Sequence, residues 1–196
     1  VYLEDARKLR AIALDKTGTI TEGKPRLVAT ETLPSAVPED RVLGWAASLA
    51  GHSDHPVAKA IAKGLDRPEN GLSDFVALAG RGIEARLDGQ RMVLGNHRLI
   101  EDRGLCGAEI EARLAVHEAQ GRSVTLLASE RQVLAIFAVA DTIKGSSRAA
   151  LAELHRLGIV SVMLTGDNSA TAAAIAREAG IDDARGNLLP EEKLAA

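Results

Sequence analysis

The sequence holds little from which a disulfide, an aromatic core or a membrane span could be built. It has one cysteine, Cys106, which excludes an internal disulfide and a CxxC metal site and fits a reducing, cytosolic setting. Aromatic residues make up only 2% of the 196 residues, so the core must be filled by Ala, Leu, Val and Ile. The longest apolar run, 133–140, is far shorter than the roughly 20 residues that span a bilayer.

Strong charge of one sign and a targeting segment are also missing. The 24 basic and 27 acidic residues give a net charge of −3, which offers no electrostatic case for nucleic acid. The first ten residues are charged and lack the apolar stretch of a signal peptide. Because the chain starts without Met and ends inside a predicted helix, we expect it to be a fragment of a longer protein.

The pattern of apolar residues changes along the chain and predicts two domains. Residues 11–15 are apolar up to Asp15 and predict a short buried strand. After Asp141 the sequence alternates between helix and strand, which is typical of parallel βα units. Predicted there are helices at 146–158 and 169–180, closed by Gly158 and Gly180, around a strand at 159–167. The fold class is therefore α/β, with a doubly wound parallel-sheet domain formed by residues 1–23 and 138–196.

Residues 24–137 have a different pattern and predict an inserted antiparallel α+β domain. Turn-forming residues such as Asp88 and Gly89 separate short alternating segments, as in β-hairpins. Strands are predicted at 26–33, 74–80, 82–88, 90–95 and in a hairpin over 123–139. Helices are predicted at 38–51, 55–65, 97–103 and 108–120.

Asp15 opens a loop, Lys16–Thr19, whose backbone N–H groups and hydroxyls suit a phosphate. A carboxylate there repels an anion, so it makes chemical sense as a nucleophile with Mg²⁺ cancelling charge. Ligands of parallel sheets bind beyond the carboxyl ends of strands, where Thr165 also lies. Thr165 could donate to a phosphoryl oxygen and Lys193 could offset its developing charge. Each motif alone is explained equally well as a turn or a helix start, but the three in this order favour phosphoryl transfer.

The segment "DKTGT" (15–19) resembles the phosphorylation signature of P-type ATPases, members of the haloacid dehalogenase superfamily. The resemblance implies that ATP phosphorylates Asp15, and that Thr165 and Lys193 are the second and third motif residues of the superfamily. The residues it assigns to catalysis are Asp15, Lys16, Thr17, Thr165 and Lys193, with Asp15 and Thr17 as Mg²⁺ ligands and Thr19, Gly166 and Asp167 in cofactor binding. Related phosphatases carry an acid/base Asp where Thr17 stands, so the aspartyl phosphate should persist here.

Motifs in the insert resemble those of heavy-metal-transporting P-type ATPases. "HSDHPVAKAI" (52–61) resembles a motif whose histidine, here His55, contacts adenine. "GRG" (Gly80, Gly82) and "GN" (Gly95, Asn96) resemble further nucleotide-site motifs of this branch. Read alone, the three are a Pro-initiated helix, a turn and a helix-capping Asn. The wording of "GNLLPEEK" and "LGNHRLIEDRGLC" resembles the zinc/cadmium/lead pumps more than the copper pumps.

The resemblance covers essentially the whole chain and implies cofactors and partners. These are ATP or ADP, Mg²⁺, and the transmembrane and metal-binding domains of a parent protein, whose catalytic part lies at the cytoplasmic face of the cell membrane. Ala50 replaces a Glu that is common in the family, so one adenine contact is missing or replaced. A Mg²⁺-binding Asp is expected beyond residue 196, so the fragment alone should be weak or inactive. Cys106 and the other histidines show no metal-ligand spacing and are expected to lie at the surface or in packing.

Three alternatives remain open from the sequence: a copper pump, a soluble haloacid dehalogenase-type phosphatase, and a non-catalytic nucleotide-binding module. Thr17 and the long insert argue against the phosphatase.

Overall fold

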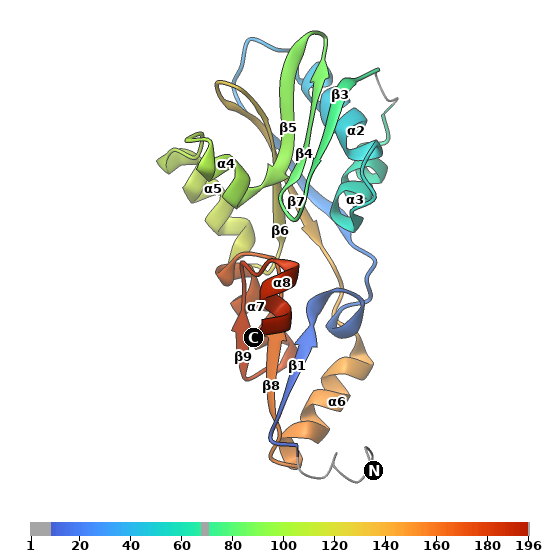
Figure 1. The fold of residues 1–196 in the computed structure, drawn as a ribbon, viewed down its shortest axis with the longest axis vertical. Helices are drawn as coiled ribbons and strands as arrows, with labels where there is room; N and C mark the ends of the chain where they lie inside the picture. Colours follow the sequence, from blue (N-terminus) through green and yellow to red (C-terminus); the bar gives the residue numbers. More distant parts are fainter. Residues whose placement is uncertain (1–8, 68–70, 196) are drawn as a thin grey trace. The chain divides into compact units, whose positions relative to one another are not determined.

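The computed structural model describes residues 9–67 and 71–195, which divide into two compact units (Figure 1). Unit 1 comprises the residues up to Lys24, Ala119–Gly121 and those from Asp141 onward. Unit 2 comprises Pro25–Glu118 and Arg122–Ala140. Each unit has its own sheet and its own core, so each is described by itself.

Unit 1 is built on a parallel sheet of three strands in the order β1-β8-β9. These are β1 (Ala11–Asp15), β8 (Val160–Leu164) and β9 (Asp183–Arg185). The helices of the unit are α6 (Gly145–Arg156), α7 (Ser169–Ala179) and α8 (Pro190–Ala195). The alternation of helix and strand after Asp141 therefore does give the predicted parallel α/β arrangement, with β1 completing the sheet.

The core of unit 1 is small and aliphatic. Ile20, Leu151, Met163 and Ile175 are buried together with alanines of α7. The prediction that residues 11–15 form a buried strand is wrong, because β1 alternates between exposed and half-buried residues. The reason lies in its position: within the described residues β1 pairs only with β8 and forms one edge of the sheet. The sequence analysis also missed β9, a three-residue strand.

Unit 2 is built on an antiparallel sheet of six strands in the order β2-β7-β6-β5-β4-β3. The strands are β2 (Arg26–Thr32), β3 (Ser73–Leu78), β4 (Gly82–Leu87), β5 (Gln90–Asn96), β6 (Ser123–Ser129) and β7 (Val133–Ala140). The helices are α2 (Glu39–Gly51), α3 (Pro56–Leu65), α4 (His97–Asp102) and α5 (Ala108–Glu118). All ten elements were predicted, with ends that differ by a few residues.

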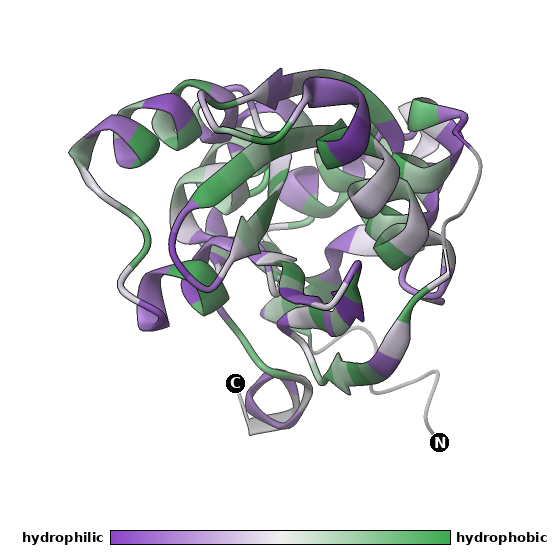
Figure 2. Ribbon diagram, turned by 90° about the horizontal axis from the view of Figure 1, so that it is seen from above, coloured by the Kyte–Doolittle hydropathy of each residue, from purple (hydrophilic) through white to green (hydrophobic). Residues whose placement is uncertain are grey.

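The two faces of this sheet are covered by different helices, α2 and α3 on one side and α4 and α5 on the other (Figure 1). Trp45, Leu49 and Ile61 pack against one face, which includes Leu94 and Phe137. On the other face, helical leucines and isoleucines pack against apolar residues of β5, β6 and β7. The helices carry apolar and polar residues side by side, as the green and purple bands of Figure 2 show, which suits a helix with one face on a sheet.

A charged network connects β2 to α5 on the second face. His117 is buried, and its Nε2 lies 2.8 Å from an oxygen of Glu31. Arg122 lies 3.2 Å from the other ring nitrogen, Nδ1, and arginine can only donate. Nδ1 is therefore the acceptor, and the ring proton is on Nε2, where it faces Glu31. Arg113 donates to the second oxygen of Glu31 at 3.2 Å. The hydrogen bond from His117, followed by that from Arg113, holds the pKa of Glu31 below its ordinary value.

Replacing Glu31 with Gln should lower the free energy of unfolding of unit 2 at pH 7 by about 1 kcal/mol, the scale of a partly exposed ion pair. Because the pKa of Glu31 is lowered in the folded state, its ionised form stabilises the fold above pH 4.5 and this contribution is lost as the pH falls further. Urea unfolding followed by fluorescence of Trp45, the single tryptophan, measures the difference. Glu109→Gln removes an exposed partner of Arg113 and should change little. A difference between wild type and Glu31→Gln that stays constant down to pH 3 would contradict this assignment.

Candidate active site

Asp15 is the last residue of β1 and stands at the carboxyl end of the parallel sheet, beside Leu164 of β8. One carboxylate oxygen, Oδ2, accepts a hydrogen bond from the backbone N–H of Thr17 at 3.1 Å. The other, Oδ1, lies 2.5 Å from Nζ of Lys193 in α8. The side chain of Asp15 is 47% exposed, so the carboxylate is held from two sides and remains open to solvent.

A second pair of charges lies at the carboxyl end of β8. Lys16 is buried, and its ammonium group forms an ion pair with Asp167. Thr165 is also buried; its hydroxyl donates to a carboxylate oxygen of Asp167 and accepts from the N–H of Asp167, both at 3.2 Å. These contacts fix the Thr165–Asp167 turn next to the Asp15 loop. The structure thus gathers at one edge of one sheet five residues that the sequence analysis had taken from distant segments: Asp15, Lys16, Thr165, Asp167 and Lys193.

The loop after Asp15 is held by residues that the sequence analysis did not assign to the site. Gly18 has a φ of +77°, a conformation that favours glycine, and its carbonyl accepts a hydrogen bond from Lys144. The carbonyl of Thr19 accepts one from the Ser147 hydroxyl at 2.9 Å. Thr21 closes the loop by donating its N–H to the carbonyl of Lys16 at 3.0 Å. Lys144 and Ser147 therefore fix the backbone of the loop. Apart from its resemblance to the family, nothing in the segment "ADTIKGSS" (140–147) predicted these two contacts.

Asp141 ties down the segment that leaves the loop. Its two carboxylate oxygens accept the N–H groups of Gly23 and Lys24 at 3.0 and 3.1 Å. Glu22 donates its N–H to the carbonyl of Thr142 at 2.8 Å. The two chain segments that lead out of unit 1 are therefore joined through one carboxylate, which sequence reasoning missed because backbone partners leave no side-chain pattern.

The loop offers oxygen atoms of the kind that Mg²⁺ prefers. The Asp15 carboxylate is partly exposed and, among the described residues, accepts one backbone hydrogen bond and one ammonium contact. Thr17 adds a backbone carbonyl and a hydroxyl in an exposed position. The donor set of Asp15 and Thr17 therefore fits a hard divalent cation, and Mg²⁺ binding there stays a prediction.

In unit 2, the glycines singled out from the sequence meet across two strands. Gly82 and Gly95 are direct partners in the β4–β5 ladder. A Cβ on Gly82 would lie 2.4 Å from the carbonyl oxygen of Leu94 and 2.5 Å from Cα of Gly95, so no other residue fits. Asn96 caps α4 by accepting the N–H of Leu99 at 3.0 Å and donates to the carbonyl of Gly80 at 3.1 Å. Gly80, Gly82, Gly95 and Asn96 therefore form one compact loop junction.

His55 lies in the loop between α2 and α3 and is exposed. Its Nδ1 accepts the N–H of Val57 at 3.3 Å, so the imidazole caps α3, and Pro56 occupies the first helical position. The same loop carries His52, whose ring centre lies 6.1 Å from that of Phe75 in β3. The loop with His55 thus stands beside β3, the strand that leads to Gly80.

These features define a class of protein: a parallel α/β unit with an exposed carboxylate at a strand end, held by a lysine and a backbone N–H, and a second unit inserted after that strand. The chain belongs to the haloacid dehalogenase-like hydrolase family, whose model matches residues 9–196. It is 40% identical over 200 residues to a copper-exporting P-type ATPase of Bacillus subtilis, covering 99% of this chain and 24% of that protein. It is 35% identical over 202 residues to a probable cadmium-transporting ATPase of Staphylococcus aureus, covering 99% and 28%. The chain spans about a quarter of the length of these relatives.

Solved structures give the same assignment of the fold. A zinc-transporting PIB-type ATPase in an E2·Pi state matches 95% of this chain and 30% of its own, with a TM-score of 0.58 and 36% identity. The catalytic domain of the CPx-ATPase CopB-B matches 99% of this chain and 67% of its own, with a TM-score of 0.74; at 21% identity it supports the fold alone. Within the described residues, no helix has both the length and the apolar character needed to cross a membrane.

Proposed function

We propose that this chain is the phosphorylation and nucleotide-binding part of a heavy-metal-transporting P-type ATPase. Unit 1 carries the phosphorylated aspartate and unit 2 binds the nucleotide; the predicted domains, residues 1–23 with 138–196 and residues 24–137, differ from these units in their bounds. The parent protein adds transmembrane and metal-binding domains and holds this part at the cytoplasmic face of the cell membrane. The observation that carries the proposal is the contact between Asp15 and Lys193 at the end of β1, with Thr165 and Asp167 at the end of the neighbouring strand.

In the proposed reaction an oxygen of Asp15 attacks the γ-phosphorus of ATP, the bond to the β–γ bridging oxygen breaks, and ADP leaves. Water later cleaves the acyl phosphate and releases inorganic phosphate. Asp15 and Thr17 would hold Mg²⁺, which offsets the negative charge of the phosphates when bound. Lys193, already in contact with the carboxylate, would move to the phosphoryl oxygens.

Lys16 and Thr165 have distinct roles in this proposal. Lys16 is buried against Asp167 and keeps the two loops in register. The Thr165 hydroxyl would turn from Asp167 to a phosphoryl oxygen, assisted by the backbone of Gly166. Thr17 and Thr19 supply the loop with hydroxyls but no second carboxylate, so water at the acyl phosphate lacks a nearby base. A slowly hydrolysed phospho-aspartate suits a pump and argues against the phosphatase alternative.

For the transported ion, we propose the Zn²⁺, Cd²⁺ and Pb²⁺ class. The motif wording at 94–106 and 186–193 supports it, together with the 35% identity to a probable cadmium-transporting ATPase. Copper is the second candidate, favoured by the 40% identity to a copper-exporting ATPase. Stimulation of ATP hydrolysis in the full-length protein by Zn²⁺ or Cd²⁺, but not by Cu⁺, distinguishes the two.

The proposed function is tested by labelling the full-length protein with γ-³²P-ATP and Mg²⁺, followed by an acid quench. We expect a label that survives acid, is released by hydroxylamine, and maps to the peptide that contains Asp15. A label that hydroxylamine leaves in place would be a phosphorylated hydroxyl and would contradict the proposal. Rapid loss of the label without a metal substrate would instead favour the phosphatase.

Nucleotide binding to unit 2 should depend on His55. Replacing His55 with Ala should weaken ATP or ADP binding by at least about 1 kcal/mol, the scale of one hydrogen bond. Isothermal titration of the 196-residue chain, without Mg²⁺, measures it. Because His55 also caps α3, His55→Asn is the matched control: asparagine restores the cap but not the imidazole. Restored affinity in His55→Asn would show that the cap alone matters and that His55 does not contact adenine.

A further inference from the structure

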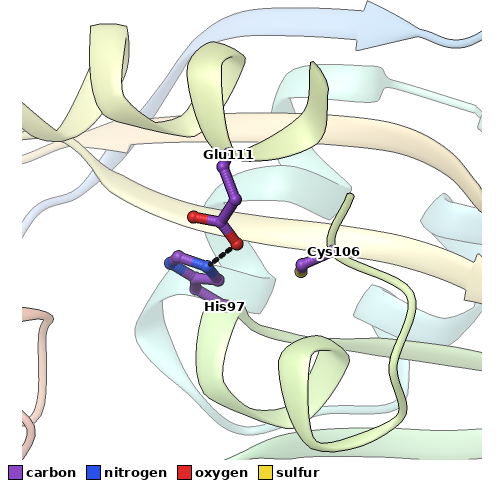
Figure 3. Close-up of side chains that lie close together, drawn as sticks. All are labelled: His97, Cys106 and Glu111. Carbon is purple, nitrogen blue, oxygen red and sulfur yellow. Dashed lines mark hydrogen bonds and ion pairs between the residues drawn. The ribbon is translucent and has the colours of Figure 1, made fainter. Parts of the chain in front are cut away.

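A group of metal-ligand side chains lies in unit 2, in the segment that directly follows the Gly80–Asn96 junction. His97 begins α4, Cys106 lies in the loop after it, and Glu111 is in α5. One ligand atom from each lies within 4.8 Å of those of the others. Figure 3 shows the His97 ring in contact with Glu111 and the side chain of Cys106 directed toward the pair. All three side chains are half-buried.

Glu118 holds the other edge of the same ring. The carboxylate of Glu118, one of the buried charged residues, lies 3.3 Å from Nδ1 of His97, and Nε2 of the same ring lies 2.8 Å from Glu111. The imidazole is therefore held between two carboxylates, and Glu118 can orient it as a ligand by accepting the Nδ1 proton. In a tetrahedral site with bonds of about 2.0–2.3 Å, ligand atoms lie about 3.3–3.8 Å apart, so a shift of about 1 Å brings the ligand atoms of His97, Cys106 and Glu111 to coordinating distance.

We propose that His97, Cys106 and Glu111, with a water in the fourth position and Glu118 orienting the imidazole, form a binding site for Zn²⁺ or a similar borderline-soft divalent cation. A thiolate, an imidazole and a carboxylate together select such an ion. Mg²⁺, which prefers oxygen ligands and octahedral geometry, should not bind here. The inference does not depend on the proposed ATPase function, because it rests on these side chains alone.

The surroundings of the group suit a cation. The hydrogen bond with Glu118 raises the pKa of His97 to about 9, and burial, with the charge of Glu111 next, raises the pKa of the Cys106 thiol to about 11. The carboxylates of Glu111 and Glu118 lie 2.8 and 3.3 Å from the imidazole, so a cation bound there would lie next to negative charge.

The site is tested by titrating the 196-residue chain with Cd²⁺ and Zn²⁺. We expect one Cd²⁺ per chain with an ultraviolet sulfur-to-cadmium charge-transfer band, displacement by Zn²⁺ and none by millimolar Mg²⁺. Cys106→Ser should remove the band. His97→Gln should weaken Cd²⁺ binding at least about 100-fold, which is the upper end of the loss of metal affinity seen when a residue that supports a ligand is replaced.

The matched control is His155→Gln, which removes another histidine paired with a carboxylate, Asp182, at 2.9 Å. That variant should bind Cd²⁺ like wild type. Far-UV circular dichroism and Trp45 fluorescence verify that each variant folds. If Cys106→Ser does not fold, Glu111→Gln takes its place, because the side chain of Glu111 is 44% exposed. Cd²⁺ binding that lacks the sulfur band, survives in Cys106→Ser and Glu111→Gln, or is displaced by Mg²⁺ would overturn the proposal.

Discussion

Asp15→Asn in the full-length protein should reduce covalent phosphorylation by ATP to background, while nucleotide affinity changes by less than about twofold. The amide keeps the shape of the carboxylate and can still accept the N–H of Thr17, which Oδ2 does at 3.1 Å. It loses the negative charge that the proposed nucleophilic attack requires and that pairs with Lys193. Acid-quenched labelling with γ-³²P-ATP measures the first effect, and calorimetric titration with ADP measures the second.

The matched control is Asp183→Asn. Asp183 is an exposed carboxylate of the same unit, at the start of β9, and lies 3.6 Å from Arg185. Its replacement should leave labelling unchanged, which excludes a general effect of removing one negative charge. Persistence of a hydroxylamine-labile label in Asp15→Asn would mean that the nucleophile is elsewhere, and the proposed role of the loop would fail.

Most of the fold could be predicted because the apolar residues follow simple periods. β4 alternates in its burial up to the Asp88–Gly89 turn, and α3 begins at a His-Pro pair and places its apolar side on the sheet. The two errors, the burial of residues 11–15 and the missing strand β9, concern properties that depend on the whole sheet. The apolar composition of 11–15 indicated burial, but burial depends on what lies on both sides of β1, and its sequence does not contain that information. β9 has three residues with polar ends, too few for any period.

The residues of the candidate active site, too, could be predicted only in part. Asp15, Thr165 and Lys193 could be found because each follows or opens a recognisable element, and their order along the chain resembles a known family. Lys144 and Ser147 could not, because they bind backbone carbonyls of the loop, and any residue at those loop positions offers the same carbonyl.

The group around His97 was missed for a different reason. Cys106 and Glu111 follow His97 by nine and fourteen residues, a spacing that matches no metal motif. Their ligand atoms meet only because α4 is short and the chain turns back into α5. The expectation that Cys106 and the other histidines lie in packing or at the surface rested on spacing, which does not report a geometry set by a loop, and the Cd²⁺ titration decides between it and the proposed site.

Gly82→Ala should destabilise unit 2 by about 2–4 kcal/mol, the sum expected for backbone strain and overpacking. Gly82 has a φ of +153°, and the added methyl group would meet the backbone of Leu94 and Gly95 at 2.4–2.5 Å. Backbone atoms of a paired strand cannot rotate away as a side chain can, so β4 and β5 must separate. Since Gly95 leads directly into Asn96, whose side chain binds the carbonyl of Gly80, the separation also disrupts the proposed nucleotide site.

Gly89→Ala, in the same hairpin, is the control that distinguishes the cost of backbone strain from the cost of a steric clash. Gly89 has a φ of +76°, and a Cβ there would meet nothing within 4 Å, so this variant should lose only about 1 kcal/mol. Urea unfolding followed by circular dichroism and Trp45 fluorescence ranks the two variants, and calorimetry with ADP below the unfolding transition tests binding. We expect Gly89→Ala to bind ADP like wild type and Gly82→Ala to bind at least tenfold more weakly. Equal stability losses would show that β4 and β5 can move apart at little cost. A destabilised Gly82→Ala that keeps full affinity would instead place the nucleotide away from the Gly80–Asn96 junction.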